Sequence, residues 1–337
     1  MKKTLLTITA VASTTFAAAQ TSSTLDAIKS NGMLKCGVVQ ALPGFAAPND
    51  NNEWHGLDAE YCRGLAAAIF GDGSKVQYVP LSSKQRFTAL QSGEVDVLAR
   101  VTTETLSRDG LGIDFVGVNY YDGQGFMVRK DLGVTSAKEL SGAAVCSNTG
   151  TTTESNMSDY FNANGMEFKP VIFEKSDEVK SAYEAGRCDV YSSDASGLYV
   201  QRSRMENPDE HIILPEIISK EPLAIAVREG DNKFADIARW SRNCSVNAEE
   251  LGVTKANVEE MKKSEDPKIQ RLLGVNTDLG EKSLGLDNAW CANQIKAVGN
   301  YGEIFETYLG KNSSLKIERG LNKLWNDGGL MYAAPIR

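Results

Sequence analysis

The sequence contains one nine-residue pattern twice, as Ala89-Leu90-Gln91-Ser92-Gly93-Glu94-Val95-Asp96-Val97 and as Ala182-Tyr183-Glu184-Ala185-Gly186-Arg187-Cys188-Asp189-Val190. Both copies read A-x-x-x-G-x-x-D-V. In each copy a helix is expected to end at the glycine, which adopts the left-handed conformation without a Cβ clash. A short apolar strand that opens with the aspartate then follows. The repeat therefore predicts two related α/β lobes.

Polar residues follow both predicted strands. Thr102, Thr103 and Arg108 come after the first repeat, and Asp194 comes after the second. An arginine offers a planar fork that matches a carboxylate, and an aspartate accepts hydrogen bonds from an ammonium group. One lobe thus offers a cation and the other an anion, which favours a site for a zwitterion between them. The competing interpretations are a surface ion pair of Arg108 with Asp109 and a helix N-cap at Asp194.

The composition of the 337 residues, with 42% hydrophobic and 24% charged residues, is that of an ordinary soluble globular protein. At the N-terminus, two lysines precede an apolar run over residues 5–16 and three alanines, the pattern of a cleaved signal peptide over residues 1–19. This predicts an exported, periplasmic protein. Removing two lysines and no acid changes the net charge from -8 to -10, so we expect no binding to nucleic acid.

Six cysteines in an exported chain predict three disulfides, although six cysteines allow many pairings and the sequence alone selects none. Their order along the predicted elements favours Cys36 with Cys62, Cys146 with Cys188, and Cys244 with Cys291. A zinc site is disfavoured, because the chain has no C-x2-C pair and only two histidines. No metal and no cofactor are predicted.

Helix and strand patterns alternate with short connections, which predicts parallel sheets covered on both faces, with the ligand edge at the carboxyl ends of the strands. In the first lobe we expect strands at 34–39 and 75–81, a helix at 59–70, and a helix that starts with a capping box at Ser82 and Gln85. The second lobe has strands at 126–129, 143–146 and 171–173 and helices at 153–163 and 176–185. A strand at 223–227 crosses back, giving two crossings and a hinge.

The predicted boundaries are 20–122 for the first part of lobe 1, 123–221 for lobe 2, and 222–337 for the return to lobe 1 with a helical C-terminal extension. Cys146 to Glu154 follows a strand and opens a helix, where free backbone N–H groups attract an anion. This loop lacks a G-K-[ST] ending, so a carboxylate suits Thr151 and Thr152 better than a nucleotide phosphate does. The alternative is that these threonines only cap the helix.

Aromatic and nucleophilic residues give weaker signals. Phe45 follows the first strand, where its ring could pack against a ligand, and Trp54 and Tyr121 are lesser candidates for the same wall. No G-x-S-x-G motif occurs, and His55 and His211 stand in polar, turn-like contexts, so no catalytic residues are predicted.

Six motifs occur together in residues 25–337: Gly56-Leu57-Asp58-Ala59-Glu60-Tyr61-Cys62, Ala89 to Val97, Tyr120 to Val128, Gly150-Thr151-Thr152-Thr153-Glu154, Gly299-Asn300-Tyr301-Gly302-Glu303-Ile304-Phe305, and Gly328-Gly329-Leu330-Met331-Tyr332. Through these motifs the chain resembles the periplasmic substrate-binding components of polar amino acid ABC transporters, solute-binding protein family 3. It specifically resembles the subfamily that binds general L-amino acids.

The resemblance implies an α/β, two-lobe periplasmic binding protein fold of type II, with parallel-rich sheets and the ligand between the lobes. It implies a monomer that traps a free L-amino acid and delivers it to an inner-membrane permease. Arg108 with the Thr151–Thr152 loop would hold the α-carboxylate and Asp194 the α-amino group, with Thr102, Thr103 and Phe45 completing the site. The alternatives are a dehydratase of arogenate or prephenate, with Glu104 as its acid, and a partner of a chemoreceptor.

One segment departs from the subfamily. Its members tend to carry Ser-Arg-Asn-Thr-Thr-Trp-Thr where this chain has Ala99-Arg100-Val101-Thr102-Thr103-Glu104-Thr105. Val101 and Glu104 thus replace an asparagine and a tryptophan next to the expected carboxylate site. We expect these two changes to reshape the pocket for the ligand's side chain.

Overall fold

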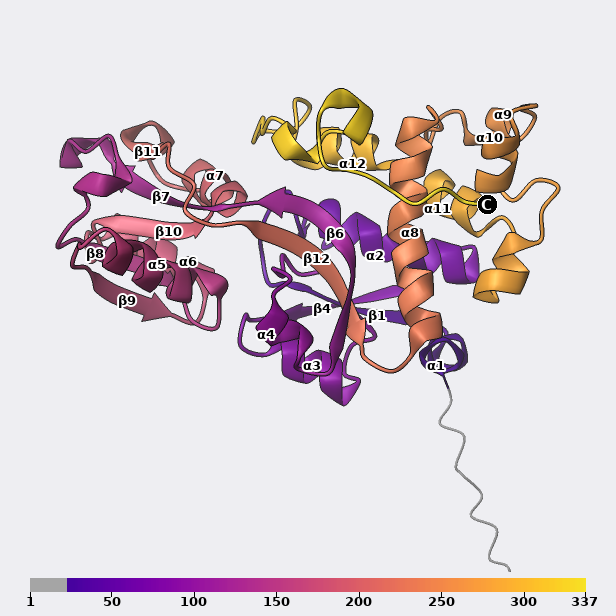
Figure 1. Cartoon of the computed structure of the whole chain (residues 1–337), viewed down its shortest axis with the longest axis horizontal. Coiled ribbons are helices and arrows are strands. Elements are labelled where there is room, and N and C mark those ends of the chain that lie inside the picture. The colour runs from indigo at the N-terminus through magenta and orange to yellow at the C-terminus, as the bar shows by residue number, and fades with distance from the viewer. Residues whose placement is uncertain (1–22) are drawn as a thin grey trace, which may run out of the picture.

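The computed structural model describes residues 23–337 and contains two lobes, each built on a five-stranded sheet (Figure 1). The predicted signal peptide, residues 1–19, lies outside the described residues. Within residues 23–337, no helix is long and apolar enough to cross a membrane. The division of the chain at residues 122 and 221 stays a prediction, and below the name lobe 1 or lobe 2 denotes the sheet and the elements packed on it.

The sheet of lobe 1 has the strand order β4-β1-β5-β12-β6. The strands are β1 (Leu34–Val39), β4 (Val76–Leu81), β5 (Val97–Leu98), β6 (Ile113–Asp122) and β12 (Glu221–Arg228), and β2 (Ala47–Pro48) pairs separately with β3 (Trp54–His55). Four helices belong to this part of the chain: α1 (Thr24–Asn31), α2 (Leu57–Phe70), α3 (Arg86–Ser92) and α4 (Leu106–Asp109).

The sheet of lobe 2 has the order β11-β7-β10-β8-β9. Its strands are β7 (Gln124–Arg129), β8 (Ala144–Asn148), β9 (Lys169–Phe173), β10 (Val190–Asp194) and β11 (His211–Ile213). Its helices are α5 (Thr152–Ala163), α6 (Ser176–Glu184) and α7 (Ala195–Ser203). Phe126 packs in a core cluster with α5, whereas its neighbour Met127 packs with α6 and α7, so both faces of this sheet are covered.

The prediction of parallel sheets was wrong for part of each sheet, because both are mixed. In lobe 1, β4, β1 and β5 are parallel, whereas β12 is antiparallel to β5 and to β6. In lobe 2, β9, β8 and β10 are parallel, whereas β7 is antiparallel to β10 and to β11. The chain leaves one lobe along one strand and returns along its neighbour, so these strands must run in opposite directions. Both sheets follow the same pattern, as two related lobes require.

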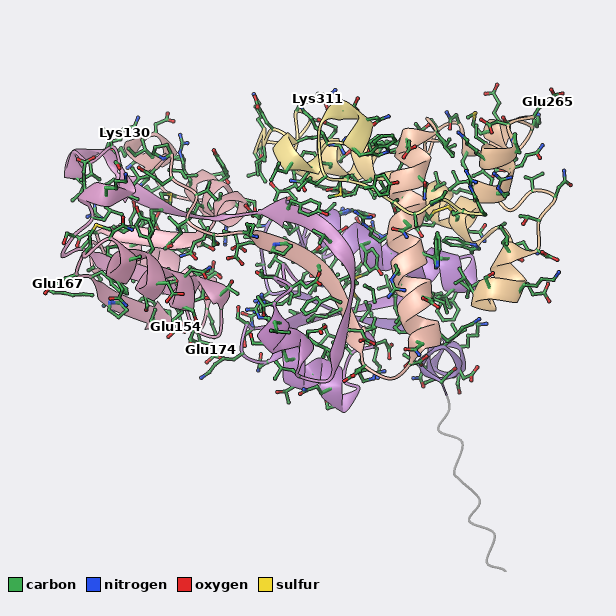
Figure 2. The ribbon with its side chains drawn as sticks, viewed as in Figure 1. Lys130, Glu154, Glu167, Glu174, Glu265 and Lys311 are labelled. Carbon is green, nitrogen blue, oxygen red and sulfur yellow. A yellow bond between two sulfur atoms is a disulfide. The ribbon has the colours of Figure 1, made fainter. Side chains whose placement is uncertain are left out.

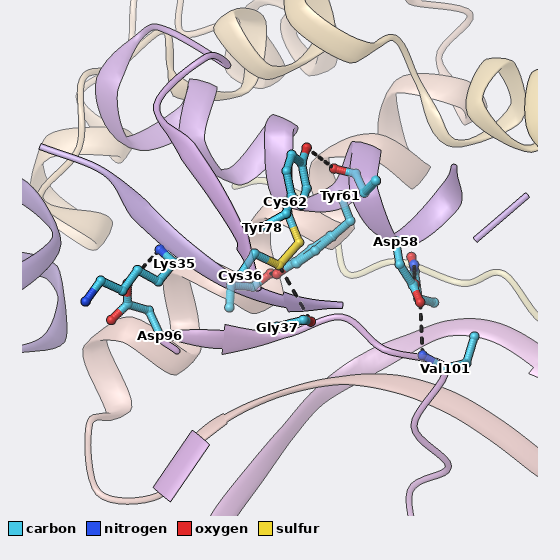
Figure 3. The surroundings of a disulfide bond; sticks show 12 residues. Lys35, Cys36, Gly37, Asp58, Tyr61, Cys62, Tyr78, Asp96 and Val101 are labelled. Atoms are coloured by element: carbon cyan, nitrogen blue, oxygen red, sulfur yellow. Dashed lines mark hydrogen bonds between the residues drawn. A yellow bond between two sulfur atoms is a disulfide. The ribbon is translucent and has the colours of Figure 1, made fainter. Parts of the chain in front are cut away.

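The two repeats adopt the same structure. Gly93 and Gly186 have φ angles of 78° and 72°, the left-handed conformation that ends the preceding helix. The carboxylate of Asp96 accepts the N–H of Lys35 at 2.9 Å (Figure 3), and that of Asp189 accepts the N–H of Ala144 at 2.8 Å. Each aspartate thereby ties its own strand to the neighbouring parallel strand, so its role is structural.

Two segments connect the lobes. One runs from β6 through Gly123 into β7, and the other runs from β11 through residues 214–220 into β12. A Cβ atom at Gly123 would lie 2.2 Å from Cγ2 of Ile217 on the other connection, so the close approach of the two segments requires glycine. At the lobe 1 end of this hinge, Asp122 of β6 and Glu221 of β12 are opposite each other in the antiparallel register of the sheet.

The C-terminal extension packs on lobe 1 and covers β6, the edge strand of that sheet. It comprises α8 (Asn232–Glu250), α9 (Val258–Met261), α10 (Pro267–Leu272), α11 (Trp290–Val298) and α12 (Tyr301–Tyr308). Arg242 donates to the carbonyl of Val118 at 3.0 Å, and the Tyr301 hydroxyl donates to that of Asn119 at 3.0 Å. The side-chain amide of Asn322 bonds both the N–H and the C=O of Tyr121, at 2.7 and 3.0 Å.

Three disulfides join the cysteines in the predicted order, Cys36–Cys62, Cys146–Cys188 and Cys244–Cys291. Figure 3 shows the first, which connects β1 to α2. The strand predicted at 34–39 has these same bounds in the structure. The capping-box hydrogen bonds between Ser82 and Gln85 are present at 3.2 and 3.4 Å, but α3 begins only at Arg86, after a turn.

Candidate functional site

A cavity of about 70 Å³ lies between the lobes. Lobe 1 lines it with Val39, Leu42, Ser83, Arg86, Arg100, Val101, Thr103 and Arg108, and lobe 2 with Asn148, Thr151, Thr152, Thr153, Ser176, Tyr191, Ser193, Asp194, Ser196, Gly197 and Gln201. Five of the seven residues expected to bind the ligand therefore line one cavity. These five are Thr103, Arg108, Thr151, Thr152 and Asp194.

The two lobes touch around this cavity. Arg86 Nη2 donates to the carbonyl of Gly150 at 3.3 Å, and the Ser82 hydroxyl donates to Glu174 at 3.3 Å. The charged residues labelled on lobe 2 in Figure 2, such as Glu154 and Glu167, lie on its outer surface. The lobes are thus in contact beside the cavity, and the arginines that line it, Arg86, Arg100 and Arg108, are buried.

Arg108 lies on the short helix α4 and is 8% exposed. Its Nη1 donates to the carbonyl of Thr103 at 2.7 Å, and its guanidinium lies 5.5 Å from the ring centre of Phe87. Among residues 23–337 it forms no ion pair, so the alternative of a surface pair with Asp109 does not hold. Burial lowers the pKa of Arg108, while the charges of Glu221 and Asp194 act in the opposite direction.

Asp194 ends β10 and occupies the N-cap position of α7. Its side chain accepts no capping hydrogen bond from the helix, so the carboxylate is left for the cavity. Burial raises the pKa of Asp194 well above its ordinary value, and the carboxylates of Asp122 and Glu221 raise it further. A cation placed in the cavity would relieve this repulsion.

The loop before α5 presents backbone N–H groups. The Thr151 hydroxyl donates to the carbonyl of Asn148 at 2.7 Å and makes no capping bond to the helix. Within the described chain, the N–H groups of Thr151, Thr152 and Thr153 donate to no backbone carbonyl. The start of this twelve-residue helix therefore offers partial positive charge and free donors to an anion.

Glu221, at the start of β12, is a residue that the sequence did not reveal. It is 1% exposed and accepts four hydrogen bonds, from Thr103 at 2.6 Å, Thr152 at 2.8 Å, Asn156 at 2.7 Å and Ser219 at 2.6 Å. Since both threonine hydroxyls give their protons to Glu221, they can only accept a hydrogen bond from a ligand. In the sequence, Glu221 is marked by its position before Pro222, at the start of the strand expected to cross back into lobe 1.

Arg86 and Arg100 also line the cavity and were not predicted. Arg86 opens α3, and Arg100 follows β5, where it donates to the carbonyl of Leu81 at 3.1 Å and to the Ser83 hydroxyl at 3.0 Å. Burial lowers the pKa of Arg100 to about 10, and the charge of Asp58 opposes this shift. Helical periodicity cannot single out Arg86, because its hydrogen bonds are to Thr102 and Gly150, which lie far from it in the sequence.

The structure does not bring Phe45 or Thr102 to the cavity wall. Phe45 is fully buried in the core of lobe 1, with its ring 5.3 Å from that of Tyr120, because the loop after β1 folds inward. Thr102 is also fully buried, and its hydroxyl donates to the carbonyl of Arg100 at 3.0 Å. The lesser candidates Trp54 and Tyr121 do not line the cavity either, nor does Glu104, which is exposed.

Residues 23–337 contain no cluster of three or more histidine, cysteine, aspartate or glutamate side chains that could hold a metal ion. The polar groups of the cavity are instead guanidinium, hydroxyl, amide and carboxylate groups of opposite charge. Such an arrangement holds a small ionic solute by direct hydrogen bonds.

The fold and this cavity define a two-lobe binding protein, and the chain belongs to family 3 of the bacterial extracellular solute-binding proteins, whose model matches residues 34–311. It is 57% identical over 324 residues to the general L-amino acid-binding periplasmic protein AapJ of Rhizobium johnstonii, covering 95% of both chains. It is 54% identical over 323 residues to the glutamate/glutamine/aspartate/asparagine-binding protein BztA of Rhodobacter capsulatus, again with 95% of both chains covered.

Among solved structures, a periplasmic binding protein of an ABC transporter from Brucella ovis, with glutathione bound, is similar over 94% of this chain and 100% of that chain. The two are 58% identical, with a TM-score of 0.92. The resemblance seen in the sequence motifs is thus confirmed at the level of family and fold.

Proposed function

We propose that this protein is a periplasmic receptor that closes its two lobes around a free L-amino acid and delivers it to an inner-membrane ABC permease. The observation that carries this proposal is the pairing of charges in the closed cavity, where Arg108 and the start of α5 face Asp194. An amino acid is a zwitterion, and buried charge-assisted hydrogen bonds to both of its ends are far less screened than at a surface.

The roles of the residues follow from their donors and acceptors. Arg108 and the N–H groups of Thr151 and Thr152 hold the α-carboxylate. Asp194 accepts from the α-ammonium group, and Thr103 accepts from it as well, because the Thr103 hydroxyl already donates to Glu221. Thr102 and Phe45 support the site from the core of lobe 1.

The relatives agree with this ligand class, since AapJ and BztA are named for binding amino acids. Glutathione, bound to the Brucella ovis relative, has a γ-glutamyl end with the same free ammonium and carboxylate groups. We further propose that the protein acts as a monomer, without cofactor or nucleic acid, and that it is not an enzyme, since Glu104 lies outside the cavity.

The test is isothermal titration calorimetry of the mature protein with the twenty amino acids and glutathione. Arg108→Met and Asp194→Asn should each weaken amino acid binding by about 2 to 5 kcal/mol, since each leaves a buried partner charge unpaired. Arg239→Gln is the matched control, because the Arg239 side chain is 46% exposed and forms an ion pair with the neighbouring Asp236, away from the cavity. Unchanged affinity in both site variants would contradict the assignment of Arg108 and Asp194 to the ligand's two charged groups. If the protein bound glutathione but no amino acid, the proposed ligand would be wrong and glutathione would take its place.

A further inference from the structure

Helix α7 begins at the cavity, but the side chain at its N-cap position does not cap it. We propose that Asp122 of the hinge is a positioning residue for the ligand's ammonium group: it caps α7 in place of Asp194 and so leaves the Asp194 carboxylate free for the ligand. This inference rests on the proposed function of the same site. It concerns a residue that does not itself line the cavity.

The hinge supplies the hydrogen bonds that the start of α7 needs, since the first N–H groups of a helix have no partner within it. β6 ends at Asp122 and continues through Gly123 into β7, beside the start of α7 (Figure 1). The N–H of Ala195 donates to the carbonyl of Gly123 at 2.8 Å. The N–H of Ser196 donates to the two oxygens of the Asp122 carboxylate at 3.4 and 3.3 Å, and the Ser196 hydroxyl donates to the same carboxylate. A carboxylate of lobe 1 thus caps a helix of lobe 2.

Without Asp122, the carboxylate of Asp194 would be the natural cap of α7. An aspartate at the N-cap position accepts the N–H of the second or third helical residue, which here are Ser196 and Gly197. The N–H of Ser196 is already bound to Asp122, and Asp194 accepts no capping bond. The Asp194 carboxylate therefore has two alternatives, the ligand's ammonium group in the cavity or the start of its own helix. By binding Ser196, Asp122 disfavours the second.

The same arrangement places two carboxylates next to each other. The ionisable groups around Asp194 are Asp122 and Tyr120 of β6, Glu221 of β12, Arg86 of α3, Arg100 after β5, and Arg108 of α4. Burial raises the pKa of Asp194, and the negative charges of Asp122 and Glu221 raise it further, against the opposite effect of the arginines. A proton or the ligand's ammonium group relieves this repulsion, so the two compete for Asp194.

Calorimetry tests the cap, with the amino acid that the wild type binds most tightly of the twenty. At pH 8, Asp122→Ala should weaken binding by about 10-fold, because Asp194 then caps α7 and the ligand must displace that cap. Asp122→Asn should stay within about 3-fold of the wild type, since an asparagine oxygen caps a helix as well as a carboxylate does. Asp231→Ala is the matched control, because Asp231 caps α8 through the N–H of Phe234 at 3.0 Å and does not line the cavity. It should lower stability and leave the affinity unchanged.

The pH profile of binding separates this role from a merely structural one. The affinity of the wild type should decrease as pH falls, because a proton then occupies Asp194 in place of the ammonium group. Asp122→Asn removes a neighbouring negative charge and so lowers the pKa of Asp194, which should move this decrease to lower pH. A residue that only holds α7 in place would leave the profile where it is.

A crystal structure of ligand-free Asp122→Ala should show the Asp194 carboxylate accepting the N–H of Ser196 or Gly197. Thermal unfolding shows whether the variants fold, and if Asp122→Ala does not, the pH profile of Asp122→Asn decides. Wild-type affinity in Asp122→Ala, equal losses in Asp122→Ala and Asp122→Asn, or identical pH profiles of the wild type and Asp122→Asn would each overturn the proposal. If the wild type bound no amino acid at all, the proposed function would fail, and the role of Asp122 with it.

Discussion

Thr103 of lobe 1 donates its hydroxyl proton to Glu221 at 2.6 Å, and the same oxygen of Glu221 accepts from Thr152 of lobe 2 at 2.8 Å. One buried carboxylate oxygen thus connects both lobes beside the cavity. The contact fixes the direction in which the two hydroxyl protons point.

We predict that Glu221→Gln weakens amino acid binding by about 1 to 3 kcal/mol. A glutamine places an N–H donor where Glu221 has an acceptor, so Thr103 or Thr152 must turn its proton toward the ligand's ammonium group. Calorimetry measures the change. Glu167→Gln on the exposed surface of lobe 2 serves as control (Figure 2), and equal affinities of the two variants would exclude this role for Glu221.

Val101 gives a second prediction. Its φ angle is 41°, in the left-handed region that a β-branched residue rarely adopts, and its N–H donates to Asp58 at 3.0 Å (Figure 3). Asparagine, which the resemblance described above leads us to expect here, adopts this conformation readily. Val101→Asn should therefore stabilise the ligand-free protein by about 1 kcal/mol in urea denaturation.

Val101→Ala is the control for this change, because alanine removes the branched side chain without gaining the local hydrogen bonding of asparagine. A gain of the same size in Val101→Ala would attribute the effect to side-chain packing in the cavity and not to the backbone conformation.

The pH dependence of stability follows from Asp122. Burial raises its pKa from 3.8 to about 6, against the opposing hydrogen bonds from Ser196 and Gly123. The folded state thus holds a proton that the unfolded state releases, so the free energy of unfolding decreases as pH rises from 3.8 to about 6. Asp58, whose burial also raises its pKa to about 6, contributes with the same sign.

Asp122→Asn removes one of these two titrations. We expect the decrease in unfolding free energy across this pH window to become smaller by about 3 kcal/mol, as measured by urea denaturation of the ligand-free protein below and above the window. If the unfolding free energy of the variant fell with pH as much as that of the wild type, Asp122 would be ionised in the folded protein across the whole pH window.

The Cys146–Cys188 disulfide closes a loop with a sequence separation of 42 and joins β8 to the start of β10. Replacing both cysteines with alanine should lower the free energy of unfolding by about 4 kcal/mol, because the unfolded chain regains the entropy of the open loop. Removing the Cys244–Cys291 disulfide, which has a sequence separation of 47, should lower the free energy of unfolding by nearly the same amount. A stability equal to that of the wild type in denaturant would refute the contribution of the bond.

Local patterns predicted the framework well. The two A-x-x-x-G-x-x-D-V segments identified equivalent helix ends, strands and aspartates, and each aspartate proved to bind the neighbouring parallel strand. The residues that follow the repeats, Arg108 and Asp194, reach one cavity because the carboxyl ends of parallel strands share one edge of a sheet.

Contacts between distant segments could not be predicted in this way. Glu221 lies 118 residues from Thr103 and 69 from Thr152, so its four hydrogen bonds depend on the closed arrangement of the lobes. Arg86 lies at the start of a helix, and its hydrogen bonds are to Thr102, 16 residues away, and to Gly150 of lobe 2, 64 residues away. Phe45 was expected at the cavity wall, but its loop turns the ring into the core, which no spacing in the sequence indicates.

The side chains that cover β6 also protect the protein from self-association. β6 is an edge strand, and the free backbone groups of such a strand can pair with another chain and start aggregation. Arg242, Tyr301 and Asn322 occupy the outward groups of Val118, Asn119 and Tyr121. The C-terminal extension thereby keeps this edge from acting as a template for intermolecular β-sheet.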